Sequence, residues 1–312
     1  MLVVVVPAVG LAVLSLAAFF GRWVWWLDVV ANFRAQFVVV LALLGLIVLM
    51  SKWRKIGYGI LGVAAVNLAV VLPLFIGSPA QAVAGAQTVS VLSFNLLSTN
   101  ESYSAVIEYI ETVDPDLVLL HEASRPWEVA MESAELGYEI VRPRSDDLIF
   151  GTLALVRGTD ISAVSYGFAA AAARAVELTF TPPNWSQPLA VLATHPLAPT
   201  DRERARLRDA QLDFAAEWAV GRSGPVVVVG DFNATPWSWP FRSLLANGDL
   251  INSQRGFGLQ PSFSSRSNLL FRVPIDHVVH SSELQVTHRQ LGPDLGSDHF
   301  PLLVDLQVAP GP

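Results

Sequence analysis

The sequence predicts an α/β (α+β) fold, a two-layer β-sandwich flanked by helices, that follows three transmembrane α-helices. The first observation is composition, because residues 1–82 are overwhelmingly apolar whereas residues 83–312 resemble an ordinary soluble domain. The second is periodicity, since short apolar runs typical of strands alternate with segments of helical spacing after residue 83. Two such halves favour two packed sheets, although the pattern alone does not exclude another α/β fold.

Two apolar stretches in residues 1–82 are long enough to cross a bilayer. Leu2 to Phe20 and Ile56 to Gly77 contain no charged residue, and each is close to the ~20 residues that a transmembrane helix needs. A cleaved signal peptide is the alternative for the first stretch, but such a peptide carries basic residues ahead of its apolar core. No basic residue precedes Arg22, so we interpret these stretches as membrane spans at about 2–20 and 56–77.

The middle span is less obvious from the sequence. Phe37 to Met50 is short, and it crosses a bilayer only if its helix begins near Val29 with Arg34 and Gln36 reaching toward the interface. We therefore predict a second span at about 29–50. Residues 78–87, rich in small and polar side chains, are expected to form a short tether to the soluble domain.

Charged and aromatic residues predict an orientation for these spans. Three basic residues lie in the loop between the second and third spans: Lys52, Arg54 and Lys55. The positive-inside rule places this loop in the cytoplasm, so the N-terminus is cytoplasmic and residues 83–312 are extracytoplasmic. Trp23, Trp25 and Trp26 then fall at the outer interface, where indole rings are favoured. The predicted location is a cell membrane, crossed several times.

The soluble domain is acidic and the chain has no cysteine. Of the 20 basic and 27 acidic residues, the first 82 positions hold five and one, which leaves a net charge of −11 for residues 83–312. Such a domain is poorly suited to binding nucleic acid by phosphate neutralisation alone. The absence of cysteine excludes disulfides and zinc–thiolate sites, although it does not decide the compartment.

Pattern also predicts the elements of the soluble domain. Strands are expected at 88–97, 117–120, 152–156, 175–180, 189–193, 226–229, 275–279 and 302–306. Helices are expected at 103–113, 201–220 and 239–246. The chain shows no internal repeat, and its one low-complexity tract is the alanine-rich segment 169–173.

Polar residues gather where the predicted strands begin or end. These residues are Asn95, Glu122, His195, Asp231, Asn233, Asp276, Asp298 and His299. Carboxylate and amide oxygens are hard ligands that suit Mg²⁺ or Mn²⁺, and histidine exchanges protons near neutral pH. Hydrolysis of a phosphoester needs those parts: a cation on the phosphoryl oxygens, an activated water and a proton donor for the leaving oxygen.

Each of these residues also has an ordinary structural interpretation. Asn95 suits a turn, Glu122 suits a helix start, and Asp231 suits a helix N-cap. His277 is expected to point to the opposite face of the strand from Asp276, because strand side chains alternate. We interpret the histidines without such partners as structural or surface residues: His121, His280 and His288.

Taken in order, the motifs resemble the endonuclease/exonuclease/phosphatase (DNase I-like) superfamily over about residues 88–308. They are Ser93-Phe94-Asn95, Leu119-Leu120-His121-Glu122, Ala193-Thr194-His195-Pro196, Val229-Gly230-Asp231-Phe232-Asn233, Ile275-Asp276-His277 and Gly296-Ser297-Asp298-His299. The N-terminal spans make the chain similar to the bacterial membrane-anchored subgroup. The resemblance implies a DNase I-like sandwich at residues 83–312 and a metal-dependent phosphoric ester hydrolase.

The resemblance also implies roles for individual residues. Asn95, Glu122 and Asp298 would hold Mg²⁺ or Mn²⁺. Asp231 would activate the attacking water, and Asn233 would steer the phosphate. His299, oriented by Asp276, would contact the phosphate and transfer protons, and His195 would protonate the leaving oxygen. A carboxylate partner for His195 is not evident from the sequence, and Tyr166 is the candidate for the phosphate-contacting tyrosine of some members.

Several functions stay open at this point. The substrate is a phosphoester, which includes nucleic acid, a lipid head group or a small phosphoester as alternatives. A nuclease-like phosphodiesterase is favoured by His195, whereas a phospholipase-C/sphingomyelinase-like or small phosphoester phosphatase is favoured by the membrane tether. A catalytically inactive membrane-bound binding protein would have lost a ligand such as Glu122, and none is lost. Three spans without intramembrane acidic residues argue against a transporter.

Overall fold

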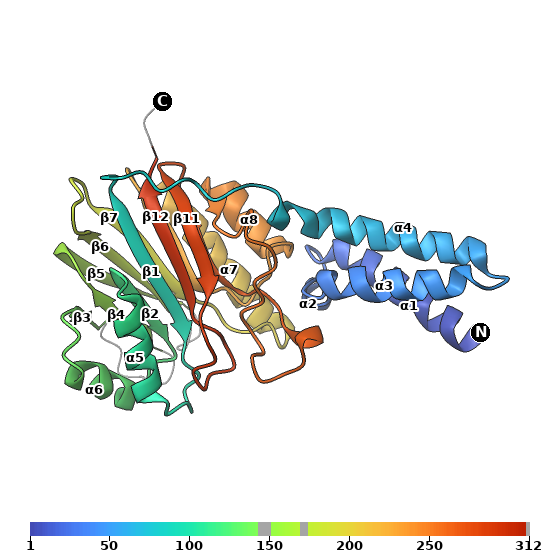
Figure 1. Ribbon diagram of the computed structural model, residues 1–312, viewed down its shortest axis with the longest axis horizontal. Coiled ribbons are helices and arrows are strands. Elements are labelled where there is room, and N and C mark those ends of the chain that lie inside the picture. The colour runs from blue at the N-terminus through green and yellow to red at the C-terminus, as the bar shows by residue number, and fades with distance from the viewer. Residues whose placement is uncertain (143–150, 169–173, 310–312) are drawn as a thin grey trace.

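The computed structural model describes residues 1–142, 151–168 and 174–309. Figure 1 shows them as a bundle of helices that projects from one end of a β-sandwich. We refer to residues 2–75 as the helical bundle and to the described residues of 88–309 as the sandwich. The alanine-rich segment 169–173 lies outside the described residues.

The sandwich consists of two mixed sheets, each with a central parallel pair of strands. The order in the first sheet is β11 (Leu284–Leu291), β12 (Leu302–Val308), β1 (Thr88–Asn95), β2 (Leu117–His121), β4 (Leu153–Val156) and β3 (Glu139–Val141). The order in the second sheet is β5 (Thr159–Gly167), β6 (Arg174–Thr181), β7 (Leu189–His195), β8 (Val226–Asp231), β10 (Asp276–His280) and β9 (Ile251–Asn252). Strands β1 and β2 run parallel, as do β7 and β8, and the other neighbours are antiparallel.

Helices cover the outer faces of both sheets, as the composition and periodicity predicted. The first sheet packs against α5 (Tyr103–Val113) and α6 (Arg125–Ser133), and the second against α7 (Arg202–Val220) and α8 (Trp239–Gly248). A third apolar cluster fills the space between the sheets. This arrangement fits a DNase I-like α/β sandwich.

Strand β8 shows why the valine run at its centre is continuous. Val227 and Val229 lie in the core between the sheets, whereas Val226 and Val228 pack under α7 and α8. Because both faces are covered, no position of this strand needs a polar side chain until Asp231. Each buried valine contributes on the order of 1.5–3 kcal/mol relative to exposure.

The helical bundle contains two long apolar helical stretches. Its elements are α1 (Leu2–Ala17), η1 (Ala18–Phe20), α2 (Trp25–Ala31), α3 (Arg34–Leu49), α4 (Arg54–Val71) and η2 (Leu72–Phe75). Within the described residues, Leu2–Phe20 and Arg54–Phe75 are each long and apolar enough to cross a membrane. The predicted middle span differs, because α2 and α3 meet at a bend of 67° and reach that length only as a pair.

The structure corrects the role expected for two polar residues of the middle span. Arg34 does not reach toward an interface but is buried, where it donates a hydrogen bond to Asn67 Oδ1 at 3.0 Å. Its guanidinium carbon also lies 3.8 Å from the centre of the Phe19 ring. Gln36 donates to the backbone oxygen of Arg272 in the sandwich at 2.9 Å. Both side chains find protein partners, which offset the cost of removing them from water.

The bundle and the sandwich are packed together through polar and apolar contacts. Asp28 of α2 pairs with Arg208 of α7 at 2.8 Å, and the Thr235 hydroxyl donates to Asn32 Oδ1 at 2.9 Å. An apolar cluster joins bundle residues such as Val71 to Trp237 of the sandwich. The tether also follows the sandwich, since the Ala80 amide donates to the Val286 carbonyl of β11 at 2.8 Å.

Gly230 is a glycine that the packing of the sandwich requires. It precedes Asp231 in β8 with φ +142°, and a Cβ there would collide with the Thr194 carbonyl of β7. We expect Gly230→Ala to lower the free energy of unfolding by more than about 2 kcal/mol, because backbone cannot yield as a flexible side chain does.

Gly137→Ala is the matched control for this prediction. Gly137 has φ +76° but no atom within 4 Å of the position of a Cβ, so only backbone strain of about 1 kcal/mol is expected. Denaturant unfolding of the full chain in detergent measures both variants. Equal losses in the two variants would show that the Thr194 contact has no part in the effect.

Candidate active site

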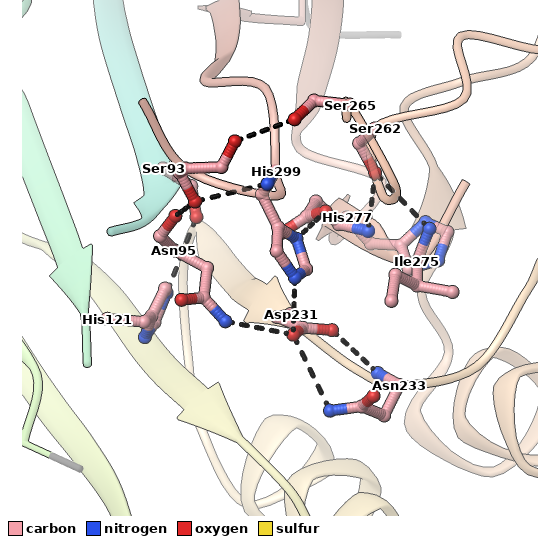
Figure 2. A network of polar contacts seen from close by, with 12 residues as sticks. Ser93, Asn95, His121, Asp231, Asn233, Ser262, Ser265, Ile275, His277 and His299 are labelled. Atoms are coloured by element: carbon pink, nitrogen blue, oxygen red, sulfur yellow. Dashed lines mark hydrogen bonds and ion pairs between the residues drawn. The ribbon is translucent and has the colours of Figure 1, made fainter. Parts of the chain in front are cut away.

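The candidate site lies where the central strands of both sheets end. Asn95 ends β1, Glu122 follows β2, His195 ends β7, and Asp231 ends β8. Parallel pairing brings Asn95 level with His121, and antiparallel pairing brings Asp231 opposite Asp276 at the start of β10. Figure 2 shows side chains from both sheets converging on Asp231.

Asp231 is the centre of this convergence. The side chain is buried, and its oxygens accept hydrogen bonds from Asn95 Nδ2 at 3.2 Å and the Asn233 amide at 2.9 Å. His195 Nε2 and His299 Nε2 lie 3.5 and 3.6 Å from Asp231 Oδ2. Burial alone would raise the pKa of Asp231, but His299 and His195 lower it well below its usual range. The carboxylate is therefore ionised at neutral pH.

His299 is held between two carboxylates. Its Nδ1 lies 2.8 Å from Asp276 Oδ2, while its Nε2 faces Asp231. Burial alone would lower the pKa of His299, but Asp276 and Asp231 outweigh it and raise that pKa to about 10. Asp276 is fixed in turn, because its backbone amide donates to Ser262 Oγ at 3.1 Å. The site thus holds an oriented imidazolium.

His195 finds the carboxylate partner that the sequence did not identify. Its Nε2 lies 3.5 Å from Asp231 Oδ2 and 3.9 Å from Glu122 Oε1. Burial opposes protonation, but Asp231 and Glu122 together raise the pKa of His195. His195 is therefore suited to hold and donate a proton near neutral pH.

Glu122 and Asn95 form the oxygen-rich side of the cluster. Glu122 follows β2 in the left-handed backbone region, with φ +55°, and its Oε2 accepts from the Ser98 amide at 3.1 Å. Asn95 Nδ2 donates both to Glu122 Oε1 at 3.1 Å and to Asp231 at 3.2 Å. The Asn95 NH2 group thus holds the Glu122 and Asp231 carboxylates close together, so hard carboxylate oxygens gather at this point.

Two neighbouring sets of side chains could hold a divalent cation, and Asn95 with Glu122 suits it better than Asp231, Asp276 and His299 do. Asp231, Asp276 and His299 offer ligand atoms within 4.8 Å of one another. However, both ring nitrogens of His299 face carboxylates and the ring is protonated, so it has no lone pair for a metal. Glu122 offers carboxylate oxygens and Asn95 an amide oxygen, which here accepts from the Leu97 amide at 3.1 Å, and oxygen ligands of both kinds suit Mg²⁺ or Mn²⁺.

Asp298 and His299 lie in the loop before β12, which the Ser297 hydroxyl fastens to the end of β1 by hydrogen bonds. Ser297 Oγ donates to the Asn95 carbonyl at 2.7 Å and accepts from the His299 amide at 3.1 Å. Asp298 is half-buried, its backbone carbonyl accepts from the Ser265 amide at 2.9 Å, and its charge contributes to the raised pKa of His299. This network ties the loop to the end of β1.

Asn233 is held by the buried Asp28–Arg208 ion pair, which was not predicted from the sequence. The residue adopts φ +49°, its side chain donates to the Pro196 carbonyl at 3.0 Å, and its own carbonyl accepts from Arg208 Nη1 at 3.2 Å. Arg208 is buried and pairs with Asp28 of the bundle. Asp28 is the one acidic residue among the first 82, and an isolated charge beside apolar segments is the signal that could have identified it from the sequence.

Tyr166 and His277 lie outside this cluster of charges, whereas His121 lies beside it. Tyr166 donates its hydroxyl to Glu177 at 2.6 Å, and its place opposite Ala175 puts it on the face beneath α7. The expectation that it contacts phosphate is therefore wrong. His277 packs against Phe241 with ring centres 4.4 Å apart, on the face away from Asp276, as alternation predicts. His121 lies beside the cluster, with its ring centre 5.9 Å from that of His195, and burial lowers its pKa to about 3, so this ring is neutral.

A helix-flanked sandwich with carboxylates and imidazoles at the ends of its central strands defines the DNase I-like class of α/β proteins. The family model described as the Endonuclease/Exonuclease/phosphatase family matches residues 92–299, so the chain belongs to that family. Members of this family are phosphoesterases and nucleases, which supports hydrolase activity. Among curated proteins, the sequence comparison finds no match.

Solved structures share this fold. The chain is similar to a humanized D. rerio TDP2, with 16% identity, a TM-score of 0.58, and coverage of 71% of this chain and 99% of that one. The human Nocturnin catalytic domain gives 19% identity, a TM-score of 0.57, and coverage of 71% and 94%. ANGEL2, a 2',3'-cyclic phosphatase, gives 16% identity, a TM-score of 0.56, and coverage of 75% and 99%. At these identities the likeness establishes the fold.

The Asp28–Arg208 pair predicts that the bundle supports the site. Asp28→Ala leaves Arg208 buried with only the half-exposed Asp209 as a carboxylate partner. Because breaking a buried ion pair leaves an uncompensated charge, we expect a loss of about 3 kcal/mol in the free energy of unfolding. Turnover should also fall, since Arg208 then holds the Asn233 carbonyl less firmly.

The double variant Asp28→Ala/Arg208→Met separates the two effects. Removing both charges should recover most of the stability, but turnover should stay low because the bond to the Asn233 carbonyl is lost. Denaturant unfolding and turnover of the full chain in detergent provide the measurements. Wild-type stability and turnover in Asp28→Ala would contradict this role for the pair.

Proposed function

We propose that this chain is a divalent-metal-dependent phosphoesterase, held at a cell membrane by its helical bundle as in the bacterial membrane-anchored subgroup of its family. One observation carries the proposal. The buried Asp231 carboxylate lies within 3.6 Å of Asn95 Nδ2 and of one ring nitrogen each of His195 and His299. Asn95 Nδ2 also lies 3.1 Å from Glu122 Oε1. Such a concentration of buried charge costs stability, and it is typical of sites where catalysis retains it.

In this proposal Asn95, Glu122 and Asp298 hold Mg²⁺ or Mn²⁺. The carboxylates of the site outnumber its imidazoles, since Glu122, Asp231, Asp276 and Asp298 surround His195 and His299. A divalent cation would offset that excess of negative charge. When bound, it supplies Lewis acidity toward the phosphoryl oxygens.

The protein's own residues account for the proton transfers. Asp231 is ionised, so it orients the attacking water and accepts its proton as the new phosphorus–oxygen bond forms. The bond to the leaving oxygen breaks, and His195 donates its proton to that oxygen. His299, oriented by Asp276, donates a hydrogen bond to the phosphoryl group, and the Asn233 amide steers the same group. The products are an alcohol and a phosphate ester or phosphate.

The substrate within this class is narrowed by charge and by location. The net charge of −11 on residues 83–312 opposes long-range attraction of nucleic acid. ANGEL2 is a 2',3'-cyclic phosphatase and its structure holds adenosine-2',3'-vanadate, which keeps a nuclease-like phosphodiesterase as one alternative. Lipid head groups and small phosphoesters are the others. Attachment to a membrane raises the effective concentration of the enzyme near lipid head groups.

Metal removal and two substitutions test this proposal. We expect EDTA to abolish hydrolysis of bis(p-nitrophenyl) phosphate by the full chain in detergent, and Mg²⁺ or Mn²⁺ to restore it. Asp231→Asn and His299→Gln should each lower kcat by roughly 10²–10⁴-fold, because each removes a group that orients water or phosphate.

The matched controls are Asp294→Asn and His288→Gln, which change exposed side chains of the same types. These controls should retain wild-type turnover. Activity that survives EDTA, or that survives both site substitutions, would contradict the proposed mechanism. Phosphate binding without turnover of DNA, sphingomyelin or inositol phosphates would instead support an inactive binding protein.

Three membrane spans and an extracytoplasmic sandwich complete the proposal. Figure 1 shows the N-terminus and the α3–α4 connection at the end of the bundle away from the sandwich. Lys52, Arg54 and Lys55 lie at or beside this connection, so the positive-inside rule places that end in the cytoplasm. We therefore assign residues 1–82 to the membrane domain and 83–312 to the catalytic domain.

Reporter fusions in a bacterial host test this topology. A periplasmically active reporter fused after residue 312 should be active, and the same reporter inserted between Ser51 and Lys52 should be inactive. The paired insertions control for expression, since both carry the same reporter. Activity only at the second position would reverse the orientation, and activity at neither would contradict an extracytoplasmic sandwich.

A further inference from the structure

The sandwich carries an apolar tip that its own core does not cover. The 3-10 helix η4 (Leu269–Phe271) consists of three apolar residues, and their exposed fractions are 71% for Leu269, 53% for Leu270 and 61% for Phe271. Three adjacent exposed side chains of this size form a patch rather than isolated surface residues. Patches of this kind mark interaction sites, because exposing them to water is unfavourable.

This tip lies beside the helical bundle. The backbone oxygen of Arg272, directly after η4, accepts a hydrogen bond from Gln36 of α3. Between them is a groove of about 160 Å³, lined by Ala35 and Val39 of α3 and by Leu259, Leu269 and Leu270 of the sandwich among other residues. The groove is therefore continuous with the side of a helix that we propose to be embedded in the membrane.

The same segment is bonded to the candidate active site. Ser265 donates its amide to the Asp298 carbonyl at 2.9 Å, and Phe263 packs on His299 with ring centres 4.9 Å apart. Ser262 Oγ accepts from the Asp276 amide. A single segment of eleven residues, 262–272, thus contacts the proposed catalytic residues at its start and carries the apolar tip near its end.

Membrane lipid fits this surface better than a protein partner does. Trp23 and Trp26, which are 70% and 48% exposed, lie between α1 and the Asp28 contact with the sandwich. Indole rings favour the membrane–water interface, so they mark its level at the sandwich end of the bundle. The groove and tip adjoin that same end, where lipid acyl chains surround a membrane-embedded helix.

We infer that the Leu269–Phe271 tip enters the outer surface of the bilayer, that a lipid acyl chain lies in the groove against α3, and that the enzyme hydrolyses the head-group phosphoester of a membrane lipid. This inference rests on the proposed function and deepens it by naming the substrate class. Arg266, an exposed residue three positions before the tip whose guanidinium also donates to the Gly296 carbonyl, offers a cationic group to head-group phosphates. The Arg272 guanidinium instead faces the protein, because it donates to the Ser265 carbonyl at 2.8 Å and lies over the Phe300 ring. Cleavage of the phosphoester by water releases the head group and leaves the acyl chains in the bilayer.

Membrane entry of the tip is tested without reference to activity. The chain has no cysteine, so Leu269→Cys in the full chain carries a single fluorescent label. Val164→Cys on β5 is the matched control, since Val164 is 50% exposed and lies on the edge strand of the second sheet. In nanodiscs that contain brominated acyl chains, the label at position 269 should be quenched and the label at 164 should not. Equal quenching at the two positions would overturn membrane entry.

Turnover tests the substrate class in the same nanodiscs. The full chain with Mg²⁺ should release head groups from sphingomyelin, phosphatidylcholine or phosphatidylglycerol, and it should also hydrolyse bis(p-nitrophenyl) phosphate. Leu269→Ser/Phe271→Ser should lower the ratio of lipid to soluble turnover by about tenfold, as the loss of two inserted apolar side chains implies. The control Val129→Ser/Val164→Ser changes exposed valines outside η4 and should keep the wild-type ratio.

The outcomes separate the inference from the function on which it rests. Hydrolysis of the soluble diester without release of any lipid head group overturns the lipid substrate and leaves the phosphoesterase proposal standing. Hydrolysis of neither substrate overturns the phosphoesterase proposal itself. An unchanged ratio in Leu269→Ser/Phe271→Ser overturns the role of the tip in lipid turnover.

Discussion

The ionised Asp231 carboxylate, buried at the end of β8, is the constraint on which the site depends. A buried charge is tolerated only where charges and hydrogen bonds compensate it. Here the compensation comes from both sheets, with Asn95 from β1, His195 from β7 and His299 from the loop before β12. Because Asn95 and His195 end strands and His299 lies just before one, the positions of the strands determine the geometry of the site. The sandwich therefore acts as a rigid support for a charge cluster that would otherwise be unstable.

The helical bundle helps to position the site in addition to its proposed role as a membrane anchor. Arg208 links the bundle residue Asp28 to the carbonyl of Asn233, and Gln36 contacts the segment that leads to His299. Both connections approach the site from the side of the proposed membrane. An enzyme built in this way would have its site in a fixed position relative to the bilayer, which suits a substrate that lies in the bilayer surface.

The sequence predicted the elements that carry strong patterns. Helix 103–113 and the valine strand β8 have clear periodicity or continuous apolar character, and the structure contains both. Strands β5 and β11 were missed because they lie at sheet edges, where exposed polar positions interrupt the apolar pattern. The motif residues were found from their places at strand ends. Arg208 and Ser262 were not, because their contacts join segments that no local pattern relates.

The location of a bound cation tests the central claim most directly. A crystal structure of the full chain with Mn²⁺, located by its anomalous scattering, distinguishes the two groups of candidate ligands around Asp231. The account predicts Mn²⁺ beside Glu122 and Asn95, with His299 still bonded to Asp276. A manganese ion ligated by His299 and Asp276, or absent from the ends of β1 and β8, would contradict it.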